Sequence, residues 1–256
     1  MLSPLRKYTI TLLIAIALIG VWVLLTTFSD FLNPIIFPPA LDIVTAFVGA
    51  IDELLKGFIS SMGLLIPAIA GALLLGISGG LFFGLHQKSR EILSPFFHTL
   101  SPLPPTLFIP YAIALLPTFK LASISILFIG AFWPIFLGAI QGVVLIEKHY
   151  WDNAKTLGLK GKDLVFKVIL PASSPHILTG TGTALTLSFI VLMMAEMFGA
   201  QSGMGHFVQY YTDFSQYDHV LAGLIFNSFI ILAIMMLFEK IKNRIIFWIN
   251  LKSDAN

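Results

Sequence analysis

The sequence predicts an all-α integral membrane protein with six transmembrane helices. Hydrophobic residues make up 57% of its 256 residues, charged residues only 11%, and the mean hydropathy is +0.92. A soluble domain carries about 25% charged residues, because its surface needs them. The apolar residues also gather in runs of about 20, the length that a helix needs to cross a bilayer. These observations exclude a soluble domain and a disordered chain.

Several chemistries are excluded by residues that the chain lacks. With no Cys, it forms no disulfide, no thiolate metal site and no Cys nucleophile. It has no extended basic tract, so no nucleic-acid partner is expected. No Gly-rich loop with Lys-Ser/Thr is present to cradle a phosphate, so any ATP would be bound by another chain. The histidines show no metal-ligand spacing, so we expect no metal site and no catalytic group at His86, His98, His149, His176, His206 or His219.

The first predicted span covers residues 10–28 and has no charge inside it. Arg6 and Lys7 precede it, as they would in a signal peptide, but no small-residue cleavage site follows. We therefore interpret it as an uncleaved anchor. Three prolines within residues 32–39 predict an extended connection. Residues 41–58 mix charged and apolar residues, which indicates an amphipathic helix at the membrane interface.

Polar segments separate the remaining spans, and their charges predict the orientation. Of the 15 Lys and Arg residues, 13 lie at the two termini, after the second span and in residues 147–175. Only Lys56 and Lys120 lie on the other side. Because cytoplasmic loops carry the excess of Lys and Arg, both termini and residues 147–175 are predicted to be cytoplasmic. The five further spans are predicted at residues 59–85, 92–116, 121–146, 176–198 and 220–238.

Small residues recur every four positions in the second span, at Ala68, Ala72, Gly76, Gly80 and Gly84. On a helix they form one smooth stripe, which lets another helix approach closely. Small residues are common in membrane helices in any case, but this regular register favours a packing seam. The stripe indicates helix association rather than chemistry.

The third span contains a segment where a regular helix cannot continue. Pro102, Pro104 and Pro105 remove three backbone donors within four residues. Irregular backbone at membrane depth needs protein or a watery cavity beside it. Two interpretations stay open. The segment is either a break near the cytoplasmic edge, where water satisfies the backbone, or a kinked element that borders a translocation path.

Glu196 is the only carboxylate well inside an apolar run, near the end of the fifth span. Such groups usually face the interior of a bundle or a cavity. One interpretation is structural pairing with backbone donors of the segment that holds Gly199, Gly203 and Gly205. The other is a direct role toward a substrate or a proton.

Residues 147–175 carry the most specific pattern in the chain. Gly158 suits the left-handed position that ends a helix. Phe166, Ile169 and Leu170 give the residues that follow an apolar face. We therefore expect two short helices around a glycine turn, the second of them ended by Pro171.

This segment resembles the EAA loop of binding-protein-dependent ABC importer permeases, which reads Glu-Ala-Ala, then Gly, then Ile-x-Leu-Pro. Asp152 stands in place of Glu and Asn153 in place of the first Ala, whereas the residues in register are Ala154, Gly158, Ile169, Leu170 and Pro171. Residues 102–110 and 195–205 look like those of the nitrate, sulfonate and taurine branch, and permeases for thiamine-pyrimidine precursors are similar too. The likeness covers about residues 41–248.

The resemblance implies a type I ABC importer permease with a five-helix core and one additional N-terminal helix. Its implied parts are an anchor with a periplasmic interfacial segment (1–55), a permease domain (56–244) and a cytoplasmic tail (245–256). It also implies a multi-pass protein of the bacterial inner membrane that uses residues 147–175 as an ATPase-coupling loop. The implied partners are a second copy of the chain, two cytoplasmic ABC ATPase subunits, a periplasmic or lipid-anchored substrate-binding protein and membrane lipid. ATP and Mg²⁺ would bind the ATPase, so no cofactor is expected in this chain.

Two other classes of membrane protein are alternatives to an ABC importer permease. A secondary transporter would need more spans or inverted repeats, and the sequence shows no internal repeat. A membrane-embedded enzyme would need intramembrane catalytic groups, and Glu196 alone supplies no pair. The implied substrate is a small polar solute of the sulfonate, taurine, nitrate or thiamine-precursor type. No cluster of intramembrane Arg or Lys marks an anion site.

Overall fold

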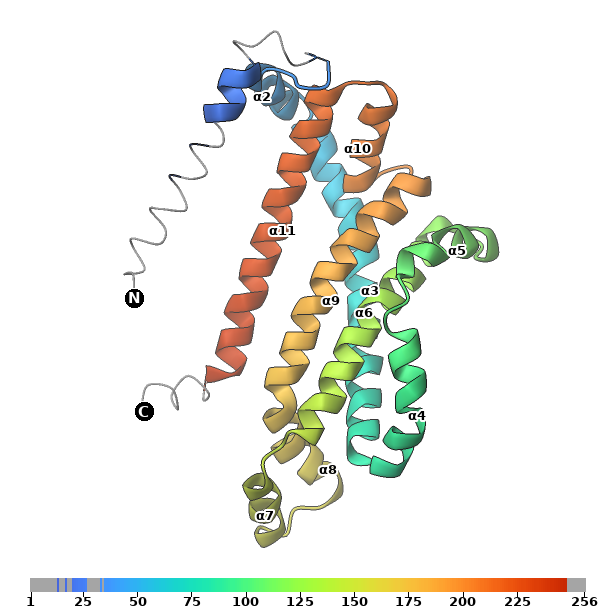
Figure 1. The fold of residues 1–256 in the computed structure, drawn as a ribbon, viewed down its shortest axis with the longest axis vertical. Coiled ribbons are helices and arrows are strands. Elements are labelled where there is room, and N and C mark those ends of the chain that lie inside the picture. Colours follow the sequence, from blue (N-terminus) through green and yellow to red (C-terminus); the bar gives the residue numbers. More distant parts are fainter. Residues whose placement is uncertain (1–12, 14–16, 18–19, 27–32, 34, 248–256) are drawn as a thin grey trace.

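The computed structural model describes residues 13, 17, 20–26, 33 and 35–247, and every regular element in that part of the chain is a helix (Figure 1). The main helices are α2 (Ala40–Gly49), α3 (Ile51–Leu85), α4 (Gln87–Leu100), α5 (Ile109–Leu115), α6 (Phe119–Val144), α7 (Lys148–Thr156), α8 (Gly161–Leu164), α9 (Leu170–Gly199), α10 (Met204–Asp213) and α11 (Tyr217–Ile245). A 3₁₀ helix, η1 (Pro105–Phe108), precedes α5, and a π-helix, η2 (Val165–Ile169), joins α8 to α9.

Four helical stretches of the described chain are long and apolar enough to cross a membrane: Ile51–Leu85, Phe119–Val144, Gly161–Gly199 and Tyr217–Ile245. They confirm the predicted all-helical membrane fold for the second, fourth, fifth and sixth spans. The first predicted span, residues 10–28, and the tail, residues 245–256, lie largely outside the described residues.

α6 forms the centre of the bundle, packed between α3 and α9 (Figure 1). The approach of α6 to α9 depends on glycine: a Cβ atom at Gly142 would lie 2.8 Å from the Cβ of Ser173. A Cβ atom at Gly138 would lie 2.8 Å from the carbonyl oxygen of His176. Because these distances are shorter than any real carbon contact, a larger side chain would force the helices apart.

The other side of α6 packs against the stripe of small residues on α3. A Cβ atom at Gly80 would lie 2.5 Å from the Cβ of Ala139, and one at Gly84 would lie 2.7 Å from the Cβ of Val143. The stripe therefore lies at a helix–helix interface in which there is no room for a side chain. All of its members are buried, namely Ala68, Ala72, Gly76, Gly80 and Gly84.

The amphipathic helix predicted over residues 41–58 is in fact divided between two helices. α2 and α3 are separated by Ala50, whose φ of −98° and ψ of 8° are not helical. α2 packs on α11 through Ile43 and Ala222. The first turns of α3 enter the bundle instead, because Leu54 is fully covered by other residues. The second span consequently begins earlier than predicted.

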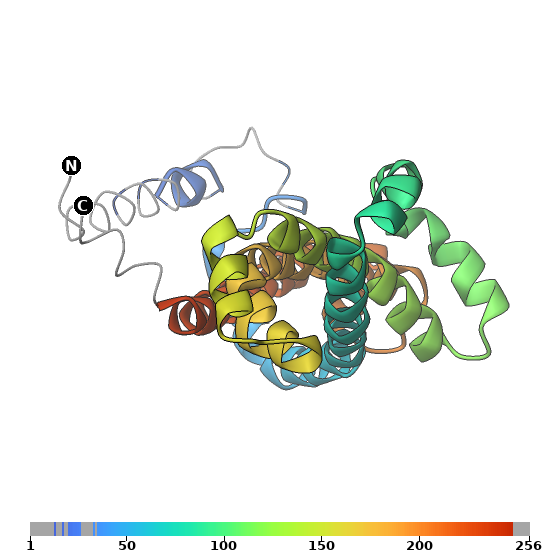
Figure 2. The ribbon, with the colours of Figure 1, turned by 90° about the horizontal axis from the view of Figure 1, so that it is seen from below.

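The third predicted span, residues 92–116, is not one helix. α4 ends before the prolines, a bend follows, and η1 and α5 complete the segment. The predicted interruption is therefore confirmed, and the continuous span is wrong, because three residues without an N–H cannot sustain a helix. Phe97 holds α4 to the bundle, with its ring centroid 4.9 Å from that of Phe136. The α5 segment stands at the side of the bundle (Figures 1 and 2).

The prediction that Pro171 ends a second short helix is wrong. α8, η2 and α9 form one helical stretch over Gly161–Gly199, and Pro171 lies in the first turn of α9. A proline inside an α-helix clashes with the carbonyl four residues before it. Because the wider π turns of η2 come directly before Pro171, the helix accommodates the ring without ending.

Candidate functional site

The predicted site residues form two groups at opposite ends of the bundle. The α7–α8 loop lies at the lower end in Figure 1, and the region around Glu196, where α9 leads into α10, lies toward the upper end. Pro102 and Pro104 join neither group, because they lie in the bend after α4. Pro105 packs on α6, with its Cγ 3.2 Å from the position of a Cβ at Gly130.

At the lower end, α7 ends in a glycine turn held by its own backbone. The N–H of Gly158 donates to the carbonyl of Lys155 at 3.0 Å, and the N–H of Leu159 donates to the carbonyl of Ala154 at 3.0 Å. This pair of bonds is a Schellman motif, which requires a left-handed residue after the helix. Gly158 supplies that residue with a φ of +67°. No atom lies within 4 Å of a Cβ built there, so the need for glycine is conformational.

The side chains of α7 divide into a buried and an exposed set. Ala154 is only 2% exposed, so its small side chain is used inside this chain. Trp151 packs against the apolar cluster around Ile169. Asp152 and Asn153 are exposed, and Leu157 is 74% exposed at the end of the helix. Beside these residues, a groove of about 250 Å³ separates α7 from the start of α9.

The exposed surface of α7 and of the turn after it therefore holds only some of the predicted coupling-loop residues. Ala154, Ile169, Leu170 and Pro171 belong to the packing of the loop onto its own helix, and all are buried or half-buried. The exposed apolar group at the end of α7 is Leu157, which sequence reasoning missed, and Phe166 on η2 is 65% exposed as well. The signal for Leu157 was a leucine directly before the helix-ending glycine in a mostly polar segment.

At the upper end, Glu196 is completely buried and both of its carboxylate oxygens are bonded. Oε1 accepts from the hydroxyl of Ser61 at 2.6 Å, and Oε2 accepts from the N–H of Gly205 at 2.7 Å. The Ser61 hydroxyl in turn accepts from the N–H of Met204 at 2.9 Å. The carboxylate thus joins α3, α9 and the first turn of α10, and we call these four residues the carboxylate clamp.

Glycines leave the room that the carboxylate clamp needs. Gly203 has a φ of +146°, and a Cβ there would lie 2.6 Å from Oε1 of Glu196. A Cβ at Gly205 would lie 2.5 Å from the carbonyl oxygen of Met193. Gly199 does not take part, because its nearest neighbours are side chains of α5 and α6. Of the three predicted glycines, the structure therefore brings two to Glu196.

A second contact ties α10 to the beginning of α3. The hydroxyl of Tyr211 donates to Oε2 of Glu53 at 3.0 Å. Burial, with this hydrogen bond to Glu53, raises the pKa of Tyr211 to about 12. The phenol therefore stays protonated and keeps its proton available for the carboxylate.

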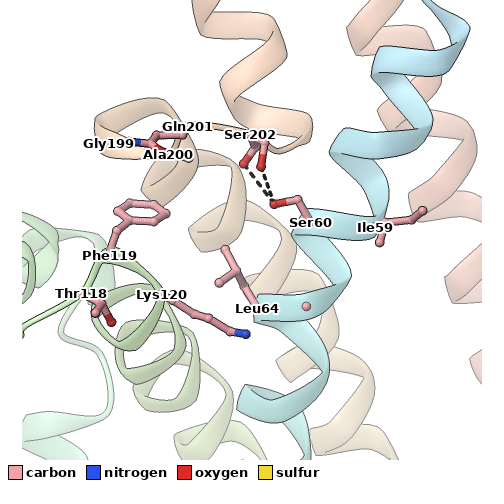
Figure 3. Close-up of a pocket in the computed structure, with 11 residues that line it drawn as sticks. Ile59, Ser60, Leu64, Thr118, Phe119, Lys120, Gly199, Ala200, Gln201 and Ser202 are labelled. Atoms are coloured by element: carbon pink, nitrogen blue, oxygen red, sulfur yellow. Dashed lines mark hydrogen bonds between the residues drawn. The ribbon is translucent and has the colours of Figure 1, made fainter.

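Next to the carboxylate clamp lies an open cavity of about 520 Å³ (Figure 3). One wall comes from α3, where the hydroxyl of Ser60 lies 2.8 Å from that of Ser202. The facing wall is the start of α6, with Thr118 and Lys120 (Figure 3). Within residues 13–247, as far as they are described, no three His, Asp or Glu side chains gather as a metal would need.

The sequence itself matches a known family over most of its length. The family model described as "Binding-protein-dependent transport system inner membrane component" matches residues 72–247. The taurine transport system permease protein TauC of Escherichia coli is 26% identical over 250 residues, which are 95% of this chain and 90% of that protein. A putative ABC transporter permease of Methanocaldococcus jannaschii is 28% identical over 235 residues, 89% of this chain and 87% of that protein.

A nitrate import permease protein of Leptolyngbya laminosa is 31% identical over 186 residues, 73% of this chain and 65% of that protein. Among solved structures, the MetNI methionine ABC transporter in inward-facing conformations has a chain with the same fold. The two superpose with a TM-score of 0.67 at 17% identity, covering 77% of this chain and 98% of that one. The secondary transporter and the membrane-embedded enzyme are thereby set aside. The chain belongs to the family of binding-protein-dependent transport system inner membrane components, and it is a membrane-embedded permease subunit of an ABC transporter.

Proposed function

We propose that this chain forms the translocation path of an ATP-driven importer for a small polar solute. It would work as a homodimer with two cytoplasmic ATPase subunits, which hold ATP and Mg²⁺, and with an extracytoplasmic substrate-binding protein. In this proposal the chain lies in the bacterial inner membrane with six spans, both termini cytoplasmic, and the parts 1–55, 56–244 and 245–256 as anchor with interfacial segment, permease domain and tail.

The distribution of charge over the bundle supports this orientation. The loop of α7 and α8, the first turn of α4 and the end of α11 lie at one end (Figure 1), and they carry all but two of the lysines and arginines of the described helices. The opposite end carries only Lys56 and Lys120. A positive excess on one side is the mark of the cytoplasmic face. A reporter fused after Gly161 should therefore report the cytoplasm, and one fused after Gln216 the other side.

The observation that carries the proposal is the packing of α7 on a helical stretch that reaches the far end of the bundle. α7 packs onto the start of a helical stretch that runs unbroken over Gly161–Gly199. Glu196 of the carboxylate clamp lies in the last turn of that stretch. A force applied to α7 by an ATPase would thus reach the opposite end through one continuous helical stretch, and such contiguous physical links can couple two sites.

The exposed side chain of Leu157 offers the sharpest test of ATPase docking. Leu157→Asp should abolish stimulation of ATP hydrolysis and co-purification of the ATPase, because a charge would replace the apolar contact. The fold should survive, since the side chain touches little of its own chain.

Lys160→Asp is the matched control, because it places an aspartate on the same loop at the N-cap position of α8. Aspartate is a favoured residue at a helix N-cap. It should retain ATPase binding. Wild-type ATPase stimulation in Leu157→Asp would contradict the proposed docking surface.

The names of the relatives support an oxyanion-bearing solute as cargo. They are named for the transport of taurine, nitrate, bicarbonate and aliphatic sulfonates. Each of these solutes carries a sulfonate, nitrate or carbonate group. We therefore propose that the solute of this importer carries such a group as well.

A further inference from the structure

The cavity beside the carboxylate clamp combines space, polar groups and a single charge. This open cavity has a volume of about 520 Å³ and lies between α3, the start of α6 and the α9–α10 connection. A volume of this order is typical of small-ligand sites. Hydroxyl and amide groups line it at Ser60, Thr118, Gln201 and Ser202, and the only charged residue in the lining is Lys120 (Figure 3).

Lys120 has no acidic partner among the described residues. None of the ion pairs between described side chains involves Lys120. Glu53 accepts from Tyr211, and Glu196 is enclosed in the carboxylate clamp. Asp218 pairs with the neighbouring His219. Lys120 is exposed, and as the only charged residue of the cavity lining it is left to attract a negative charge from outside the chain.

The wall opposite Lys120 is held in place by buried hydrogen bonds. Ser60 and Ser202, which face each other across 2.8 Å, directly precede Ser61 and Gly203. Ser61 is bonded to Glu196, and Gly203 packs against the same carboxylate. The hydroxyl groups of the cavity are therefore positioned before any ligand arrives, which lowers the entropic cost of binding.

We propose that this cavity binds a small soluble oxyanion, with Lys120 as its charge partner and with Ser60 and Ser202 as hydrogen-bonding groups. The proposal rests on the proposed function, in that the bound anion is the solute on its way into the translocation path. Phosphate groups of lipids share this chemistry, so the test has to separate a soluble anion from a lipid headgroup.

Because the chain has no Cys, a single introduced cysteine reports on the cavity without background. Gln201→Cys places the thiol in the cavity lining. The full-length chain in phosphatidylcholine discs is labelled with anionic sulfonatoethyl and cationic trimethylammonioethyl methanethiosulfonate. Adding Lys120→Gln should lower the ratio of anionic to cationic labelling rates about fivefold to tenfold, the effect of one nearby charge in a partly screened site. Lys120→Arg should retain the ratio.

Thr45→Cys is the matched reporter outside the cavity, on the exposed face of α2. Its labelling ratio should not respond to Lys120→Gln. Replacing chloride by nitrate or methanesulfonate at constant ionic strength should slow the labelling of Gln201→Cys. This protection should disappear in Lys120→Gln and should be the same in discs that also contain phosphatidylglycerol.

Three results would overturn the proposal. The first is a ratio of anionic to cationic labelling rates that does not change in Lys120→Gln. The second is labelling of Gln201→Cys that nitrate and methanesulfonate do not slow. The third is protection by phosphatidylglycerol alone, which would identify a lipid-headgroup site. None of these measurements uses ATP or transport. Failure of the chain to bind and stimulate an ATPase would therefore count against the proposed function and leave the result for the anion site intact.

Discussion

The two ends of the bundle are stabilised in different ways. The α7–α8 loop keeps its shape through backbone hydrogen bonds and two glycines with positive φ, Gly158 and Gly161, and most of its side chains are exposed. The opposite end keeps its shape through a buried carboxylate, a buried hydroxyl and glycines that leave no space. One end is thus determined by conformation and the other by packing and hydrogen bonds.

This difference predicts where substitutions are tolerated. A surface change in the loop alters what the loop can bind but leaves the fold intact, unless it removes a left-handed glycine. A change that removes a bonded group of the carboxylate clamp leaves a buried polar group unpaired, and one that adds atoms to its glycines forces atoms together, so such changes act on folding first. The loop is therefore suited to contact a partner, and the carboxylate clamp is suited to hold the anion cavity.

The largest effect is expected for Gly203→Ala. The backbone of Gly203 has φ of +146° and ψ of 166°, a region that is essentially restricted to glycine and costs other residues about 1–3 kcal/mol. The new Cβ would also meet the carboxylate of Glu196. The midpoint of thermal unfolding in detergent should drop sharply.

Gly63→Ala is the control, because nothing lies within 4 Å of a Cβ built at Gly63. It should be neutral or gain about 0.5–1 kcal/mol. Equal stability of the two variants would contradict the packing description of this end.

Glu196→Leu should come next. It leaves the hydroxyl of Ser61 and the N–H of Gly205 without their acceptor, and each unpaired buried donor costs about 1–3 kcal/mol. Glu196→Gln should be much milder, since its amide oxygen still accepts from Gly205. Unfolding midpoints and solute uptake should be measured for both. If Glu196→Gln folds normally but loses uptake, the carboxylate acts through its charge and not only through the carboxylate clamp.

Gly158→Val should have the smallest effect on stability and a clear one on coupling. A left-handed conformation costs a side-chain-bearing residue about 1–2 kcal/mol, and this strain would reorient the end of α7. Insertion should be normal while ATPase stimulation falls. Gly158→Asn should restore much of it, because asparagine tolerates the left-handed region and the surrounding space is open. Wild-type stimulation in Gly158→Val would mean that the turn is only a connector.

The sequence by itself determined the features that follow from local chemistry. Long apolar runs predicted four of the observed spans, because a helix is the way in which such a run satisfies its backbone in lipid. The prolines at 102, 104 and 105 predicted the break after α4, since they lack the N–H that a helix needs. Gly158 predicted the turn that ends α7, because glycine adopts the left-handed conformation without strain whatever its neighbours are.

Only the tertiary structure decided which residues meet. Nothing in the sequence distinguishes Ser61, since a serine in a membrane helix can hydrogen-bond to the backbone of its own helix. In the structure its hydroxyl donates to Glu196, which is 135 positions away in the sequence. Ala154 is buried because α7 packs near the start of α9. Pro171 lies inside a continuous helical stretch because the π turn before it leaves room for the proline ring. Lys120 lines the cavity beside the carboxylate clamp only because α3, α6 and the end of α9 come together around it. Contacts of this kind depend on the close packing of distant segments, which no local pattern encodes.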